Sequence, residues 1–143
     1  MTNKRKGMLG EVKVMAKLIE LGYNVAVPYG DNAPYDLILD YNGTLLRLQV
    51  KTSSGTSDGK TSFEIGRRRR NSKGQRRVQY SKDEIDYFAL YSVVRDKIYL
   101  VSADDAPSEE ISIRYEPTKN NNVIGVHMEE DYLIDVVLQR MDD

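Results

Sequence analysis

The 143-residue sequence contains no cysteine and a single histidine, His127. The absence of cysteine excludes disulfides, thiolate zinc sites and cysteine nucleophiles, and it fits a reducing compartment. One histidine also excludes a metal site built from several imidazoles. Any metal ion in this protein must therefore be bound mainly by oxygen atoms, which favours magnesium, manganese or calcium.

Long apolar segments are missing as well. The sequence has no run of about 18 apolar residues, so no membrane-spanning helix and no membrane partner are expected. The basic start, residues 1–6, is followed by a segment that Lys13 and Lys17 interrupt, which is not typical of a secretory signal. We expect a cytoplasmic protein, and the length predicts one domain, residues 1–143, with its own hydrophobic core.

Charge is distributed unevenly along the chain. The net charge is −1, from 21 Lys and Arg and 22 Asp and Glu. Residues 67–77 hold seven positive charges and no negative one, which leaves 14 positive and 22 negative residues elsewhere, a net charge of −8. This segment predicts a contact with DNA phosphates, with a solvated loop or a localisation signal as the alternative. Its basic residues are Arg67, Arg68, Arg69, Arg70, Lys73, Arg76 and Arg77.

The dipeptide Asn42-Gly43 separates two segments that alternate between apolar and polar residues. This arrangement predicts a β-hairpin with a two-residue turn, in which Tyr41 pairs with Thr44 and Asp36 lies opposite Gln49. One face of the hairpin is then apolar, with Leu37, Leu39, Leu46, Leu48 and Val50. The other face brings together Asp36, Gln49 and Lys51, which is the chemistry needed to hold a divalent cation beside a phosphate.

The remaining elements follow from periodicity. Residues 7–21 predict a helix that packs through Met8, Val12, Met15, Ala16 and Ile19, with Glu11 at the edge of this stripe. Strands are expected at 24–27, 61–65, 87–94 and 97–102, an edge strand at 111–115, a loop at 67–77, a short helix starting at Ser81-Lys82-Asp83-Glu84, and a final helix at 128–137. Helices and a mixed sheet in this order indicate an α/β or α+β layered fold.

Hydrolysis of a phosphodiester requires an attacking water and relief of the charge that develops on the phosphate oxygens. Asp36 is the expected direct metal ligand, and Glu11 a second ligand or the holder of a water molecule. Gln49 offers an amide oxygen and Val50 a backbone carbonyl. Lys51 is expected to orient the water or to help deprotonate it. The competing interpretation is a solvated sheet face, because many half-exposed strands carry an acid and a lysine.

Three segments resemble the PD-(D/E)XK nuclease superfamily: Gly10-Glu11, Pro34-Tyr35-Asp36 and Gln49-Val50-Lys51. Most members carry Asp or Glu where Gln49 stands. A Gln-x-Lys variant is found in the group I intron-encoded homing endonuclease branch, which the stretch 28–36 and residues 80–88 also resemble.

This resemblance implies a restriction-endonuclease-like α/β core, a mixed central sheet flanked by helices. It implies site-specific, Mg²⁺-dependent cleavage of double-stranded DNA, with Mn²⁺ able to substitute, by a homo-oligomer, a dimer or tetramer. It also implies a prokaryotic or phage-encoded, nucleoid-associated protein. A Holliday junction resolvase, or a DNA-binding module of the same fold that has lost catalysis, are the alternatives.

Overall fold

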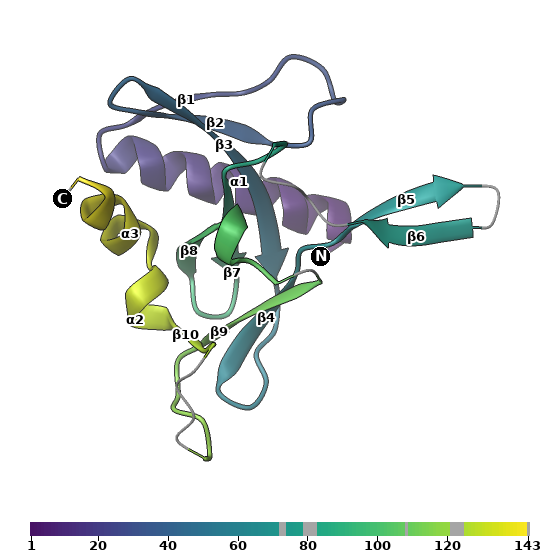
Figure 1. The fold of residues 1–143 in the computed structure, drawn as a ribbon, viewed down its shortest axis with the longest axis vertical. Coiled ribbons are helices and arrows are strands. Elements are labelled where there is room, and N and C mark those ends of the chain that lie inside the picture. The colour runs from purple at the N-terminus through teal and green to yellow at the C-terminus, as the bar shows by residue number, and fades with distance from the viewer. Residues whose placement is uncertain (72–73, 79–82, 108, 121–124, 143) are drawn as a thin grey trace.

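A five-stranded mixed sheet lies at the centre of the computed structural model, with strand order β1-β2-β3-β7-β8 (Figure 1). The structure describes residues 1–71, 74–78, 83–107, 109–120 and 125–142. The elements are α1 (Asn3–Glu20), β1 (Asn24–Ala26), β2 (Leu37–Tyr41), β3 (Thr44–Ser53), β4 (Lys60–Glu64), β5 (Arg67–Asn71), β6 (Gly74–Val78), β7 (Tyr87–Ser92), β8 (Lys97–Ser102), the 3-10 turn η1 (Ala103–Asp105), β9 (Glu110–Arg114), β10 (His127–Met128), α2 (Glu129–Tyr132) and α3 (Ile134–Met141).

The two faces of this sheet are covered differently. Helices α1 and α3 pack on one face, where Val14 and Leu138 join one hydrophobic cluster with residues of β2, β3, β7 and β8. The other face packs on a second sheet of order β10-β9-β4, through a cluster that includes Phe63, Leu90 and Ile111. The fold is therefore layered as helix, sheet and sheet, and the expected α/β class is confirmed. No helix in the described part of the chain is long and apolar enough to cross a membrane.

The hairpin of β2 and β3 has the predicted turn. Asn42 and Gly43 have φ values of 50° and 97°, as a type I′ turn requires. The carboxylate of Asp40 accepts a hydrogen bond from the Gly43 N–H at 2.8 Å, which stabilises the turn. The ladder runs from the pair Tyr41 and Thr44 to the pair Leu37 and Leu48, so the predicted register is confirmed over the whole of β2.

Helix α1 forms as expected but buries a different face. The stripe that packs on the sheet consists of Gly10, Val14 and Leu18, whereas Met8, Val12 and Ile19 are exposed. Of the predicted stripe only Met15 packs partly against the core, and the prediction was wrong for the rest because the helix has two apolar stripes. A hydrophobicity count favours the stripe without glycine, but close packing on β3 selects the side on which Gly10 leaves room for the strand.

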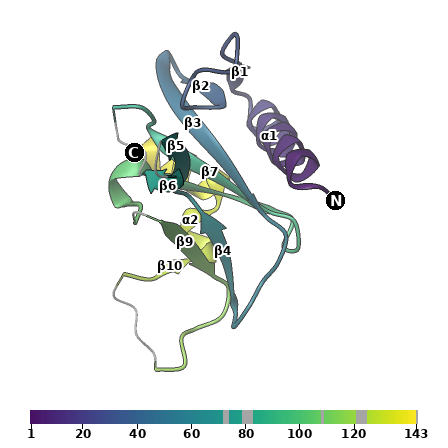
Figure 2. The same ribbon diagram turned by 90° about the vertical axis from the view of Figure 1, so that its right-hand side faces the viewer.

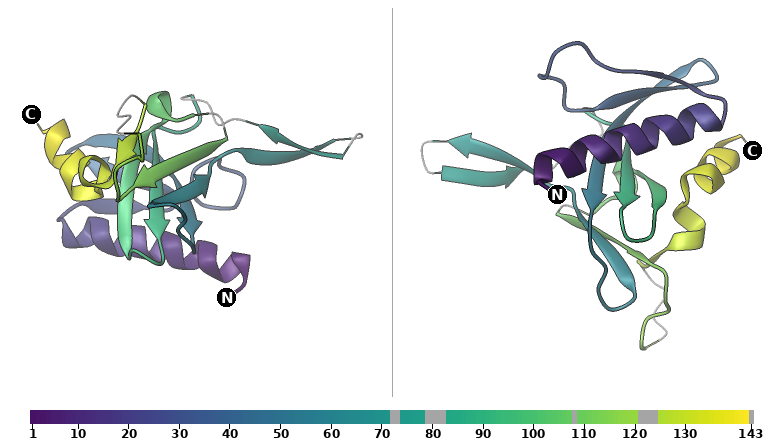
Figure 3. Two further views of the ribbon diagram at one scale, coloured as in Figure 1. Left: turned by 90° about the horizontal axis from the view of Figure 1, so that it is seen from below. Right: turned by 180° about the vertical axis from the view of Figure 1, so that it is seen from behind.

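Three further expectations were wrong. Residues 67–77 are not a loop: β5 and β6 form an antiparallel ribbon that projects from the body (Figures 1 and 3). Strand β9 is not at an edge, because it lies between β10 and β4. The helix expected from Ser81 is a turn at residues 83–84, while Ser81 and Lys82 lie outside the described residues.

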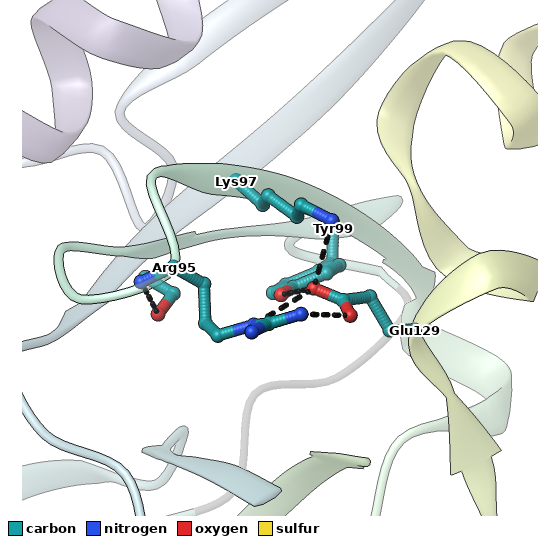
Figure 4. A network of polar contacts seen from close by, with 5 residues as sticks. Arg95, Lys97, Tyr99 and Glu129 are labelled. Atoms are coloured by element: carbon teal, nitrogen blue, oxygen red, sulfur yellow. Dashed lines mark hydrogen bonds and ion pairs between the residues drawn. The ribbon is translucent and has the colours of Figure 1, made fainter. Parts of the chain in front are cut away.

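The C-terminal helices are attached to the sheet by the buried carboxylate of Glu129 (Figure 4). It accepts hydrogen bonds from the Arg95 guanidinium and from the Tyr99 hydroxyl, each at 2.7 Å. Lys97 adds an ion pair at 3.5 Å. Burial raises the pKa of Glu129, but the hydrogen bonds from Arg95 and Tyr99 outweigh this effect and hold the pKa below its ordinary value.

Candidate active site

The candidate site lies where β2 and β3 separate. The ladder between them ends at Leu37 and Leu48, and the N–H of Asp36 donates to the carbonyl of Leu48 at 2.8 Å. Asp36 and Leu37 thus both face Leu48, as in a β-bulge. The chain before Asp36 departs from the sheet, while β3 continues alongside β7 as far as Ser53. One edge of β3 is therefore left open directly after Leu48.

Asp36 takes the place of the missing strand partner. Its Oδ2 accepts a hydrogen bond from the N–H of Val50 at 2.9 Å, and among the described residues Oδ1 has no hydrogen-bond donor. Burial raises the pKa of Asp36, the hydrogen bond from Val50 and the charge of Lys51 lower it, and the net shift is upward. The carboxylate is thus held in a fixed position, with one oxygen available to a ligand.

Glu11 approaches the same place from α1. Gly10 packs so closely on β3 that a Cβ atom there would overlap with the Thr52 hydroxyl. This contact sets the distance between helix and strand at the residue next to Glu11. Burial raises the pKa of Glu11, and the negative charge of Asp36 raises it further. The charge of Asp36 is therefore close enough to disfavour ionisation of Glu11.

Gln49 and Lys51 lie on the opposite face of β3 from Leu48 and Val50. The latter two belong to the cluster beneath α1, whereas Phe88 and Leu90, the strand partners of Gln49 and Lys51, belong to the cluster beneath the second sheet. Gln49 is buried, and Lys51 is close enough to Asp36 for its charge to favour the carboxylate. The alternation predicted from the sequence is confirmed here.

The available donors fit a hard divalent cation. Two carboxylates, an amide and a backbone carbonyl are all oxygen donors of the kind that Mg²⁺ and Mn²⁺ take. A divalent ion bound here would offset the effect of the Asp36 charge on Glu11 and would favour the ionised form of both carboxyl groups. Among the described residues no group of three His, Cys, Asp or Glu side chains could hold a metal. The remaining ligands would therefore be Gln49, the Val50 carbonyl, water or the phosphate itself.

The structure thus brings Glu11, Asp36 and Lys51 together, but the ladder does not extend to the predicted pair of Asp36 with Gln49. Asp36 uses its side chain to reach Val50 instead, because the bulge shifts the pairing by one residue. The role of Thr52 was not foreseen. A glycine inside a helical pattern was the only signal that a strand residue approaches the helix there.

A second unforeseen contact lies at Arg47, the residue before Leu48. Arg47 bonds Asp86 three times, through its backbone N–H at 2.7 Å and through its guanidinium at 3.1 and 3.2 Å. These bonds attach the chain that enters β7 to β3, beside the site. No local pattern predicts this pair, because the partners are 39 residues apart.

The basic segment forms the β5–β6 ribbon. Its backbone register places Arg68 opposite Arg77 and Arg69 opposite Arg76. Lys73 lies outside the described residues. A projecting ribbon of this composition is suited to a polyanion such as the DNA backbone.

Comparisons with known proteins agree with this geometry. The sequence profile of the PD-(D/E)XK endonuclease family matches residues 1–135. A search of curated protein sequences found no match. Among solved structures, the chain is similar to a bacterial homing endonuclease, I-Ssp6803I, with a TM-score of 0.80 and 23% sequence identity, covering 99% of this chain and 97% of the other. At this identity the likeness establishes the fold.

Proposed function

This chain belongs to the PD-(D/E)XK endonuclease family, and we propose that it cuts double-stranded DNA at specific sites in a reaction that depends on a divalent metal. The observation that carries the proposal is the position of Asp36, which the Val50 N–H holds at the point where β2 and β3 separate, with Glu11 of α1 close by. Placing a second carboxylate beside a buried one costs stability, and a cation bound at the site would offset this cost.

Each residue has a proposed role in hydrolysis. A water oxygen forms a bond to phosphorus, the bond to the leaving sugar oxygen breaks, the water loses a proton, and the leaving oxygen gains one. Lys51 orients the water, helps to remove its proton and offsets the charge that develops on the phosphate oxygens. The bond from the Val50 N–H keeps the Asp36 carboxylate in place throughout the reaction.

We propose Mg²⁺ as the natural cofactor, with Mn²⁺ able to substitute. Glu11, Asp36, the Gln49 amide and the Val50 carbonyl would hold it. When bound, the ion would supply charge neutralisation at the phosphate and a lower pKa for water in the site. Because Gln49 is neutral, only two carboxylates would contact the ion. Less negative charge would then surround the ammonium group of Lys51 than in a site with three carboxylates.

Several larger-scale features belong to the same proposal. The β5–β6 ribbon binds the duplex. Residues 1–143 form one nuclease domain, which is supported by the shared cluster of Val14 near the start and Leu138 near the end. One site cuts one strand, so a homo-oligomer supplies the second cut. The similarity to I-Ssp6803I supports site-specific cleavage of the homing type.

Paired variants test the catalytic assignment. We expect Asp36→Ala and Lys51→Ala each to lower the cleavage rate of duplex DNA by at least about 1,000-fold. Duplex binding, measured by gel shift with Ca²⁺, should remain within about threefold of wild type, because neither side chain belongs to the ribbon. Cutting at the wild-type rate by either variant would refute the assignment. Comparing a four-way junction with a matched linear duplex would reveal a junction resolvase instead.

The ribbon is tested by the salt dependence of binding. Replacing Arg69 or Arg76 by alanine should weaken duplex binding about tenfold and reduce the slope of log K against log salt by about 1. Lys60→Ala, a change in β4 away from the ribbon, is the control and should leave the slope unchanged. Unaltered slopes in both arginine variants would mean that the ribbon does not contact phosphates.

A further inference from the structure

The outer side of α1 carries an apolar stripe that no other element of the described chain covers. Figure 2 shows that the side of α1 away from the sheet is open. The exposed fractions of Met8, Val12 and Ile19 are 55%, 59% and 61%. The stripe consists of Met8, Val12, Ala16 and Ile19 of α1, and it is extended by Met1 just before the helix and by the aliphatic part of Arg5, all exposed. Steps of three or four residues are the spacing with which helices pack against one another.

The fold does not use this stripe. Gly10, Val14 and Leu18, on another side of the helix, make the contact with the sheet. The stripe borders a hollow of about 370 Å³, which is lined by Met1, Arg5, Met8, Leu9 and Val12. A contiguous apolar surface with a hollow for side chains is typical of a protein–protein contact.

We propose that the outer face of α1 binds the same face of a second copy of this chain, with the two helices antiparallel and Val12 at the two-fold axis. In this register Arg5 lies across from Ile19 and Glu20 of the partner subunit. The symmetry repeats that pair at the other end, so the surface is complementary to itself. A parallel pairing would place Arg5 beside Arg5 and Glu20 beside Glu20, which is unfavourable.

This contact is the interface of the proposed homo-oligomer. It rests on the proposed function only in that a second subunit is needed to cut the second DNA strand. Because the stripe lies on the outer side of α1, pairing there leaves Gly10 and the residues beneath it in contact with β3. The experiment can be read without DNA or metal, so its failure would leave the catalytic proposal untouched.

Sedimentation equilibrium on the full chain gives the first result. Wild type should sediment at a multiple of 16.3 kDa, and Val12→Glu should raise the dissociation constant by about 30-fold or more. Val94→Glu is the matched control, because Val94 is also a valine and is 58% exposed, at the turn between β7 and β8. This control should behave as wild type. A monomeric wild type, or an assembly that survives Val12→Glu, would overturn the proposal.

Cross-linking gives a second result that does not depend on a disruptive charge. The chain has no cysteine, so Val12→Cys introduces a single thiol that should form an intermolecular disulfide under mild oxidation, because the two copies meet at the axis. Ile19→Cys and Val94→Cys should remain unlinked, the former because an antiparallel pair separates the two Ile19 positions. Rapid linkage through Ile19→Cys without linkage through Val12→Cys would overturn the antiparallel register.

Discussion

At the scale of single residues, Asp36 serves both the fold and the proposed chemistry. Its side chain replaces a strand partner by accepting from the Val50 N–H, yet burial raises its pKa above the ordinary value of 3.8. The sign of the effect on stability follows. The contribution of protonated Asp36 to the free energy of unfolding is fully present below the ordinary pKa. It is lost as the pH rises through the raised pKa of the folded state. At neutral pH the ionised carboxylate therefore costs stability when no cation is bound.

Asp36→Asn should remove that cost and keep the bond, because an amide oxygen also accepts from Val50. We expect the free energy of unfolding in a chelating buffer at neutral pH to rise by about 1 kcal/mol. Urea denaturation measures it, and Asp31→Asn, an exposed change in the preceding loop, should stay within about 0.5 kcal/mol of wild type.

Addition of Mn²⁺ should reverse the order of stability of wild type and Asp36→Asn. Wild type gains stability from an ion that binds only the folded state, whereas the asparagine variant has lost a charged ligand and should gain much less. A variant that is less stable than wild type in chelator would contradict the account of Asp36.

At the scale of elements, the contact between α1 and β3 positions Glu11. Gly10→Ala would press a methyl group onto the Thr52 hydroxyl, and the helix must shift away from the strand. We expect a loss of about 1–3 kcal/mol in stability and a fall of about 100-fold in the cleavage rate, because Glu11 moves with the helix.

The same helix offers a matched control. Gly7 has nothing within 4 Å of the position of a Cβ atom, so Gly7→Ala should raise stability by up to about 1 kcal/mol through helix propensity and preserve cleavage. Adding Thr52→Ala to Gly10→Ala should restore part of the lost activity. Equal activity of the two glycine variants would show that the close contact does not position Glu11.

The attachment of α2 depends on one carboxylate. Glu129→Ala should cost about 2–3 kcal/mol, because Arg95 and Tyr99 lose their shared acceptor. Since the pKa of Glu129 is lowered, this stability is present above the ordinary value and is lost as the pH falls through the folded-state value. Thermal unfolding of Glu129→Ala and of the exposed neighbour variant Glu130→Ala, at neutral pH, checks the prediction. Equal midpoints would refute it.

The elements also show what the sequence could and could not predict. The hairpin was predictable because Asn42 and Gly43 tolerate the positive φ that its turn requires, which is a local property. The buried face of α1 was not, because two apolar stripes compete and packing on Thr52 decides between them. The β5–β6 ribbon was not predictable either, because its arginine-rich sequence has no alternation of apolar and polar residues. The bulge at Asp36 depends on where the chain leaves the sheet, which has no local signature.

At the scale of the whole molecule, the ribbon segment, residues 67–77, holds seven basic residues and no acidic one, while the rest of the chain has a net charge of −8. In the proposed function, the acidic body repels DNA and the ribbon attracts it. The charge distribution therefore favours one orientation on the duplex, and a second copy attached through α1 would supply a second ribbon and a second cutting site.

Plasmid cleavage tests the central claim most directly. Supercoiled plasmids that carry a library of target sequences are incubated with the wild-type chain and Mg²⁺, or with a chelator, and the products are separated on a gel. The account predicts nicked and linear products from a subset of sequences with Mg²⁺ and none with chelator. Tight binding of the plasmids without any cutting in Mg²⁺ or Mn²⁺ would contradict it and would identify a DNA-binding module that has kept the fold without the chemistry.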